Sequence, residues 1–175
     1  MEETKAIIEA IIFASEAPIS AEKIREVLPD IEKKEIIRLL QELIAEYENR
    51  WGGFLLQEVA GGFQFRTRSD LSSWMTKLMK VKQTMMSGAA METLAVIAYK
   101  QPVVKSEIDR IRGVDAGSPL RGLLEKKLVR IMGRKDVPGK PIMYGTTKKF
   151  LEVFNLKDLS ELPTLKELKD LQEGV

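Results

Sequence analysis

The sequence predicts a mainly helical α+β protein that contains two copies of one small domain. The first observation is a helix that ends at proline. Apolar residues recur on one helical face from Met91 to Tyr99, and Pro102 cannot continue that helix because its nitrogen has no proton to donate. The second observation is that the pattern occurs 84 residues earlier, with Pro18 in the place of Pro102. Hydrophobic positions stay in register over about forty residues, which indicates an internal repeat.

The third observation is a two-stranded hairpin after the third helix of each copy. In the first copy, strands are predicted over 54–59 and 63–68, where Phe63, Phe65 and Thr67 alternate with polar residues. In the second copy they are predicted over 129–132 and 141–146, joined by a basic wing tip over 133–140. Three helices followed by a hairpin make a winged helix. The predicted fold class is therefore mainly α with small β-hairpins, in two tandem winged-helix domains.

The helices of the first copy are predicted over 3–15, 20–28 and 32–48. Ser20 is suited to cap the second of these, because its hydroxyl can accept a proton from an unpaired N–H of the first turn. A closing helix over 70–80 carries apolar residues on one face: Leu71, Trp74, Met75 and Leu78. Residues 82–88 are polar and rich in methionine, and we interpret them as a linker.

The second copy begins near Ser87, and its third helix carries the stripe Leu120, Leu123, Leu124 and Leu128. Ser118 is the expected N-cap of this helix, with Pro119 at its first position. A short helix over 147–154 closes the copy. We therefore predict an N-terminal winged helix over 1–82, a C-terminal winged helix over 88–155 and a leucine-rich tail over 156–175. The tail has two open interpretations: packing on its own domain, or docking on a partner.

The composition argues against an enzyme. The chain has 175 residues with neither cysteine nor histidine, so thiolate chemistry is excluded and the commonest general base and metal ligand are missing. No pair of carboxylates stands out as catalytic. We expect no enzymatic activity, no metal and no cofactor. No apolar run approaches the length of a membrane span, and the acidic N-terminus differs from a secretory signal, so we expect a cytoplasmic protein.

Charge is distributed unevenly although the net charge is only +2. Residues 1–60 carry 7 basic and 13 acidic side chains, and the acidic third helix would repel DNA phosphates. Residues 121–149 carry 9 basic and 2 acidic side chains, and the third helix of this copy has no Asn or Gln to read a base edge. Weak contact with the DNA backbone and a simple solvated face both remain open. The basic residues of the second copy that we considered are Arg121, Lys126, Lys127, Arg130, Arg134, Lys135 and Lys140.

Several stretches of the second copy together resemble the family of segregation and condensation protein B (ScpB), the winged-helix partner of the kleisin in bacterial SMC condensin. The matching stretches are Glu92-Thr93-Leu94-Ala95, Ile97-Ala98-Tyr99-Lys100-Gln101-Pro102, Glu107-Ile108, Ile111-Arg112-Gly113-Val114-Asp115, Leu120-Arg121, Leu123-Leu124-Glu125, Gly133-Arg134-Lys135-Asp136-Val137-Pro138-Gly139-Lys140-Pro141, Tyr144-Gly145-Thr146-Thr147 and Phe150-Leu151. The first copy fits in pattern only. Val104 and Ala116-Gly117-Ser118-Pro119 depart from the family pattern at two helix starts.

The resemblance implies a non-catalytic subunit that supports chromosome condensation and segregation during cell division. It implies tandem winged helices, a homodimer formed mainly by the N-terminal domains, binding to the kleisin subunit (segregation and condensation protein A) and through it to SMC, and association with the nucleoid. No membrane association and at most weak or indirect DNA binding are expected. The competing hypothesis from the residues alone is a winged-helix transcription regulator, which would bind DNA selectively and in a salt-sensitive way.

Two sets of candidate site residues follow. Five residues in the matching stretches are candidates for partner binding: Tyr99, Lys100, Arg112, Arg134 and Lys135. Three aromatic residues beside the first hairpin are candidates for dimerisation: Trp51, Phe54 and Phe63. The alternative interpretation puts Tyr99 and the three aromatic residues in the core and gives Arg134 the role of fixing the wing.

Overall fold

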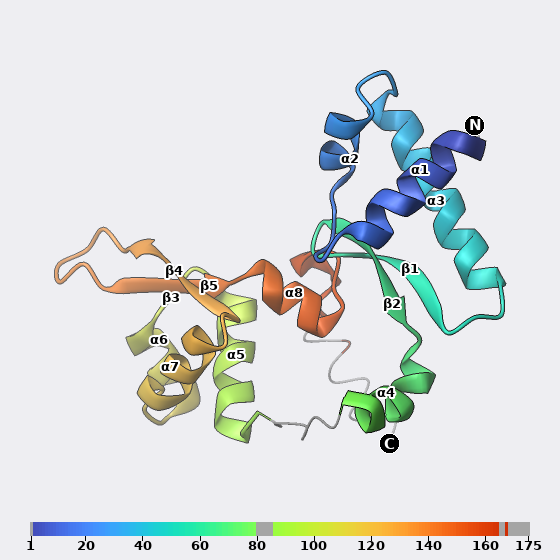
Figure 1. Ribbon diagram of the computed structural model, residues 1–175. Coiled ribbons are helices and arrows are strands. Elements are labelled where there is room, and N and C mark those ends of the chain that lie inside the picture. The colour runs from blue at the N-terminus through green and yellow to red at the C-terminus, as the bar shows by residue number, and fades with distance from the viewer. Residues whose placement is uncertain (1, 80–85, 165–166, 168–175) are drawn as a thin grey trace. The chain divides into compact units, whose positions relative to one another are not determined.

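The computed structural model describes residues 2–79, 86–164 and 167 (Figure 1). The chain divides into two compact units. The first unit comprises Met1–Lys82 together with Asn155–Val175, and the second comprises Gln83–Phe154. Each unit has a winged-helix arrangement of helices and a small antiparallel sheet, which confirms the predicted fold class.

The first unit begins with three helices, α1 (Glu2–Ala14), α2 (Ala21–Val27) and α3 (Lys33–Asn49). The antiparallel hairpin of β1 (Phe54–Val59) and β2 (Gly62–Thr67) follows, then the short 3-10 helix η1 (Ser69–Leu71) and α4 (Ser72–Met79). The 3-10 helix η2 (Leu159–Glu161) belongs to the same unit. Ser20 caps α2 as predicted, since its hydroxyl accepts the Lys23 N–H at 3.2 Å.

The second unit repeats this order. It contains α5 (Gly88–Lys100), β3 (Val103–Val104), α6 (Lys105–Arg112), α7 (Gly117–Glu125), β4 (Val129–Arg134), β5 (Ile142–Thr146) and α8 (Lys148–Phe154). Its sheet has the strand order β3-β5-β4. Ser87 is the N-cap of α5, because its hydroxyl accepts the Ala90 N–H at the first turn of that helix.

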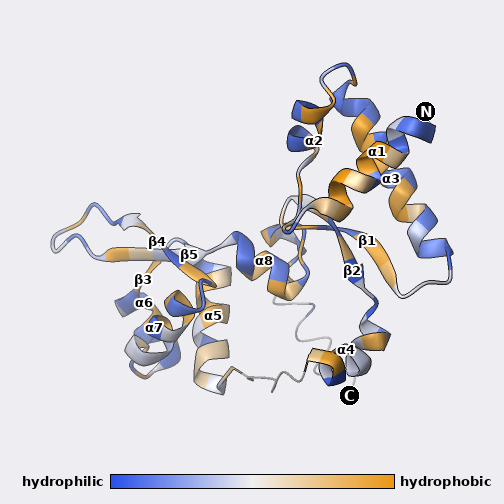
Figure 2. Cartoon of the chain, in the orientation of Figure 1, coloured by the Kyte–Doolittle hydropathy of each residue, from blue (hydrophilic) through white to orange (hydrophobic). Residues whose placement is uncertain are grey.

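The hydrophobic core of the first unit lies between the three helices and the hairpin. The fully buried side chains include Ile8 and Ile12 of α1, Ile24 of α2 and Leu40 of α3. In Figure 2 hydrophobic and hydrophilic residues alternate along α3, as expected for a helix that buries one face. At the end of α3, Tyr47 packs edge-on against Phe65, with the ring centroids 4.8 Å apart. This contact joins the third helix to the sheet.

Both units contain one backbone contact that the sequence did not predict. In each unit the residue after the repeat proline (Pro18 or Pro102) pairs with the second wing strand. In the first unit, the N–H of Ile19 donates to the Phe63 carbonyl at 3.0 Å, and the N–H of Phe63 donates back at 2.8 Å. In the second unit, β3 pairs with β5. A strand of one or two residues is too short to show a periodicity, so the pattern could not reveal it.

The start of α7 corrects a prediction. Ser118 is not the N-cap, because the helix begins at Gly117 and the capping position falls on Ala116. The N–H groups of Ala116 and Gly117 donate to the carboxylates of Asp109 (2.8 Å) and Asp115 (2.9 Å). Because these carboxylates accept the backbone N–H groups at the start of the helix, no capping hydroxyl is needed there. Ser118 instead lies within the first turn.

The start of the C-terminal tail contacts the first unit. At the turn of the β1–β2 hairpin, the Ala60 N–H donates to the Leu156 carbonyl and the Gly61 N–H donates to the Lys157 carbonyl, both at 2.9 Å. The side chain of Asn155 accepts a hydrogen bond from Arg66 of β2 at 3.2 Å. Residues 155–157 therefore contact the hairpin of the N-terminal winged helix. Docking of the tail on a partner stays a prediction.

Candidate partner-binding surfaces

The candidate residues of the second unit lie on two elements or on the wing. Tyr99 (39% exposed) and Lys100 lie at the C-terminal end of α5, where both side chains reach the surface. The structure therefore excludes the interpretation that Tyr99 is a core residue. An exposed aromatic ring beside a cation is a suitable contact for another protein, because aromatic residues are enriched at protein interfaces.

The wing residues are held by contacts within the wing and with α6. Arg134 donates to the Lys140 carbonyl at 3.0 Å, and the Lys135 N–H donates to the Pro141 carbonyl at 2.9 Å. The Lys135 ammonium forms an ion pair with Glu107 of α6 at 2.8 Å. That ion pair lowers the pKa of Glu107, and the hydrogen bond that its carboxylate accepts from the Val104 N–H lowers it further. Arg134 thus fixes the wing, and Lys135 attaches the wing to the start of α6.

Arg112 is a structural residue. Its side chain is only 4% exposed, and its guanidinium donates to Glu92 of α5 (3.3 Å) and to the Asp115 carbonyl (3.3 Å). Its buried Nε has no hydrogen-bond partner in the part of the chain that the structure describes. Because the guanidinium is enclosed between α5 and the end of α6, direct contact of Arg112 with a partner would require these helices to move apart.

A network of charges surrounds the start of α7. Lys105 forms ion pairs with Asp109 (2.8 Å) and Asp115. Lys105 is the main cause of a lowered pKa at both carboxyls, and the backbone N–H groups of Ala116 and Gly117 lower it further. This network explains why the departure of residues 116–119 from the family pattern leaves the helix start intact.

The three candidate dimerisation residues differ in exposure. Trp51 is fully exposed, Phe54 is 36% exposed and Phe63 is 5% exposed. Phe63 lies in the core, so its surface is too small to contact a partner directly. The dimerisation role stays a prediction for Trp51 and Phe54. Arg50 lies over the ring of Phe54, 5.2 Å from its centroid, so the patch combines aromatic and cationic groups.

Further apolar residues are exposed on the first unit. Phe13 of α1, and Trp74, Leu78 and Met79 of α4, are largely solvent-accessible. The sequence had indicated α4 as an amphipathic helix, but none of its residues is buried. Phe13 was missed because it lies in an uninterrupted apolar run, in which the outward face cannot be told from the inward one.

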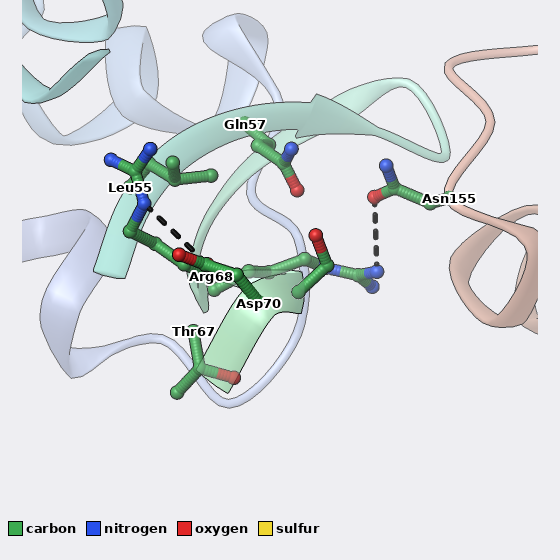
Figure 3. Close-up of a pocket in the computed structure, with 8 residues that line it drawn as sticks. Leu55, Gln57, Thr67, Arg68, Asp70 and Asn155 are labelled. Carbon is green, nitrogen blue, oxygen red and sulfur yellow. Dashed lines mark hydrogen bonds and ion pairs between the residues drawn. The ribbon is translucent and has the colours of Figure 1, made fainter. Parts of the chain in front are cut away.

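A polar pocket lies on the outer side of the β1–β2 hairpin (Figure 3). It has a volume of about 370 Å³ and is lined by Leu55, Gln57, Arg66, Thr67, Arg68, Ser69, Asp70 and Asn155. Two of its cations are engaged within the pocket: Arg66 donates to Asn155, and Arg68 lies 3.7 Å from a carboxylate oxygen of Asp70. Asn155 was not a sequence candidate, because its partner Arg66 lies 89 residues away.

No group of three or more acidic side chains, the type of ligand this composition offers, is placed to hold a metal ion among residues 2–79 and 86–164. Within the same ranges, no helix combines the length and the apolarity that crossing a bilayer requires.

Comparison with known proteins identifies the family. Residues 6–165 match the family model described as segregation and condensation complex subunit ScpB. Segregation and condensation protein B of Syntrophotalea carbinolica is 48% identical over 169 residues, which cover 97% of this chain and 85% of that protein.

Two solved structures are also similar in sequence. The crystal structure of ScpB from Mycobacterium tuberculosis is 28% identical, covers 89% of this chain and 96% of that one, and has a TM-score of 0.42. A dimer of an ScpB N-terminal domain complexed with an ScpA peptide is 28% identical, covers 44% of this chain and 95% of that one, and has a TM-score of 0.41. The family match and the 48% identity decide the assignment: this chain belongs to the ScpB family of segregation and condensation proteins.

Proposed function

We propose that this protein is a non-catalytic homodimeric subunit that binds the kleisin ScpA and supports the SMC complex in chromosome condensation and segregation. Family membership carries the proposal, since the family match spans residues 6–165 and therefore both winged helices. The composition supports a role without catalysis, because the chain lacks histidine and cysteine. We place its action in the cytoplasm, on the nucleoid, where such a complex would meet the chromosome.

The first unit is proposed to form the dimer. An ScpB N-terminal domain has been solved as a dimer with an ScpA peptide, and this chain shares the family. The exposed rings of Trp51 and Phe54 support this assignment. Covering an aromatic side chain that is in water in the monomer makes the free energy of dimerisation more favourable. Trp51 is the better probe of the two, since it is fully exposed and its removal costs no core packing.

The dimer proposal is tested by light scattering during gel filtration. We expect Trp51→Ala to shift the protein from dimer to monomer at micromolar concentration. Trp74→Ala is the matched control, because Trp74 is an exposed tryptophan of α4 in the same unit. A dimer that is unaffected by Trp51→Ala, or that is lost equally in both variants, would contradict a dimer interface at Trp51.

The end of α5 is proposed to bind the kleisin. Tyr99 and Lys100 are exposed and lie in the stretch that resembles the family pattern. We expect Tyr99→Ala with Lys100→Ala to weaken binding of purified ScpA at least tenfold in calorimetry, since aromatic anchors are commonly worth about 2 kcal/mol or more at an interface. Arg121→Ala is the control, because Arg121 is an exposed cation on α7 of the same unit. Unchanged affinity in the double variant would remove these residues from the interface.

The alternative of a sequence-specific DNA regulator is not favoured. In the first unit, two of the three cations in the first half of α3 are paired with glutamates: Lys33 with Glu22, and Arg38 with Glu35 and Glu42. Such a helix presents little positive charge to a major groove.

A further inference from the structure

A second feature of the C-terminal unit does not depend on kleisin binding. Five cations gather at the base of its hairpin, the end away from the wing tip: Lys126, Lys127, Arg130, Lys148 and Lys149. They come from three places in the chain, namely the turn after α7, strand β4 and the start of α8. All five side chains are exposed.

Backbone contacts bring these segments together. The Thr147 N–H donates to the Leu128 carbonyl at 3.2 Å, and the Thr147 hydroxyl donates to the Lys127 carbonyl at 2.7 Å. The Arg130 guanidinium donates to the Thr146 carbonyl at 3.2 Å. The two lysines that follow Thr147 are therefore held beside the two lysines of the turn after α7. The hydrophilic start of α8 is visible in Figure 2.

The charges of this cluster are not neutralised in the described part of the unit. None of the five cations forms an ion pair there, whereas Lys105, Arg112, Arg121 and Lys135 each have a carboxylate partner. Two carboxylates share these elements. Glu125 is paired with Arg121, and Glu152 lies one turn after Lys148 on α8 and has interactions of its own. The cluster thus keeps an excess of positive charge.

We propose that this cluster, the basal lysine cluster, binds the phosphate backbone of double-stranded DNA without sequence selectivity. Lysine is suited to phosphate as a point charge, and clustered unpaired cations release counterions from DNA on binding. The neighbouring sequence contains no Asn or Gln over 120–130 or 145–152, so direct reading of base edges by amide side chains is not available there. Within these ranges no large hydrophobic residue is exposed, and the exposed Ile131, Met132 and Val153 lie just beyond them. The density of lysine favours phosphate, because the centre of a protein interface is usually depleted in lysine.

The test measures anisotropy of two unrelated labelled 30-bp duplexes with the full-length protein over a series of salt concentrations. We expect both duplexes to bind with equal affinity and with a logarithmic salt slope no steeper than about −4.5, since each phosphate contact contributes about −0.9 and the cluster has five cations. Lys148→Gln with Lys149→Gln should weaken binding about tenfold or more and reduce the slope by about 2. Lys148→Arg with Lys149→Arg keeps both charges and should keep the affinity, which separates charge from folding.

The matched control removes two exposed cations elsewhere in the same unit, Arg110 on α6 and Lys140 on the wing tip. Arg110→Gln with Lys140→Gln should leave the affinity within twofold. Equal weakening by the two glutamine variants would overturn the proposal, because net charge rather than the cluster would then govern binding. Absence of DNA binding by the wild type at 50 mM salt would also overturn it. If the cluster variant instead loses affinity for purified ScpA, the surface serves a protein partner and the proposal is wrong.

Discussion

The two winged-helix units have the same order of elements but differ in how they hold their wings. In the first unit the wing is a tight hairpin with a turn at Ala60 and Gly61, and the main chain of residues 156–157 accepts both of that turn's N–H groups. In the second unit the wing extends over residues 135–140 and is held by its own hydrogen bonds and by the ion pair of Lys135 with Glu107. The apolar positions that both units share determine the fold. The conformations of the two wings are determined by polar contacts that differ between the units.

The units also differ at the junction between the first helix and the sheet. In the second unit Gln101 donates to the Ala98 carbonyl and to the Thr146 hydroxyl, and accepts the Thr146 N–H at 2.8 Å. The position 84 residues earlier is Ala17, which has no polar side chain. The first unit joins its helix to the sheet through the backbone pairing of Ile19 and through one long contact, in which the Gln64 amide of β2 donates to the Glu16 carbonyl at 3.4 Å. In the second unit the Gln101 amide makes several shorter contacts.

The strongest test of this comparison removes one equivalent leucine from each unit. Leu39 and Leu123 occupy matching positions of the repeat and are both buried. We expect Leu39→Ala and Leu123→Ala each to cost about 2–5 kcal/mol of unfolding free energy, because each leaves a cavity. Native-state hydrogen exchange should show the loss only in the unit that carries the substitution. Equal loss of protection in both units would show that they unfold as one.

A second test uses two glycines of the wing strands, Gly62 and Gly145, which lie where the segment after the first helix of each unit meets the sheet. A Cβ on Gly62 would lie 2.8 Å from the backbone carbon of Pro18, whereas a Cβ on Gly145 would meet the side chains of Met132 and Gln101. Backbone cannot move aside as easily as a side chain, so Gly62→Ala should destabilise more than Gly145→Ala. Overpacking usually costs about 1–3 kcal/mol, and we expect the two variants at opposite ends of that range in urea unfolding. If Gly145→Ala destabilised more than Gly62→Ala, the surroundings of Gly145 in the second unit would be the more rigid.

The smallest expected effect is on the pH dependence of the stability of the second unit. Lys105 lowers the pKa of Asp109, so this ionised carboxylate stabilises the second unit above its unfolded pKa of about 3.9, and the stabilisation is lost as the pH falls through the lower folded pKa. Asp109→Asn keeps an acceptor for the Ala116 N–H and removes the charge. The variant should melt below the wild type at pH 7, and the difference should narrow towards pH 3. Asp136→Asn on the wing tip is the control, and a similar narrowing there would contradict the assignment to Asp109.

Most of the secondary structure could be predicted from the sequence because apolar periodicity and proline positions are local signals. The helix over 32–48 and the hairpin strands agree with α3, β1 and β2 within one residue or so at each end. The predicted cap Ser118 was wrong because its competitors, Asp109 and Asp115, are aligned with the helix start only after α6 has formed.

The candidate site was harder to predict for the same reason. Arg112 looks like a surface cation in sequence but is enclosed by its contact with Glu92. Arg134 is exposed, and its hydrogen bond to a carbonyl six residues away could not be read from the sequence. Trp51 and Phe63 are both aromatic residues near one hairpin, yet their exposures are opposite. A side chain's partners depend on which elements meet, and a single sequence does not state that.

The contact of residues 156–157 with the first hairpin has a consequence for biosynthesis. The ribosome delivers the chain from its N-terminus, so the acceptors for Ala60 and Gly61 emerge only after all of the second unit has been translated. The nascent first unit therefore has two unpaired donors at its hairpin turn for the whole of that interval. These two contacts form only after residues 156–157 have been synthesised, and a truncation before Asn155 would leave both N–H groups of the turn to water.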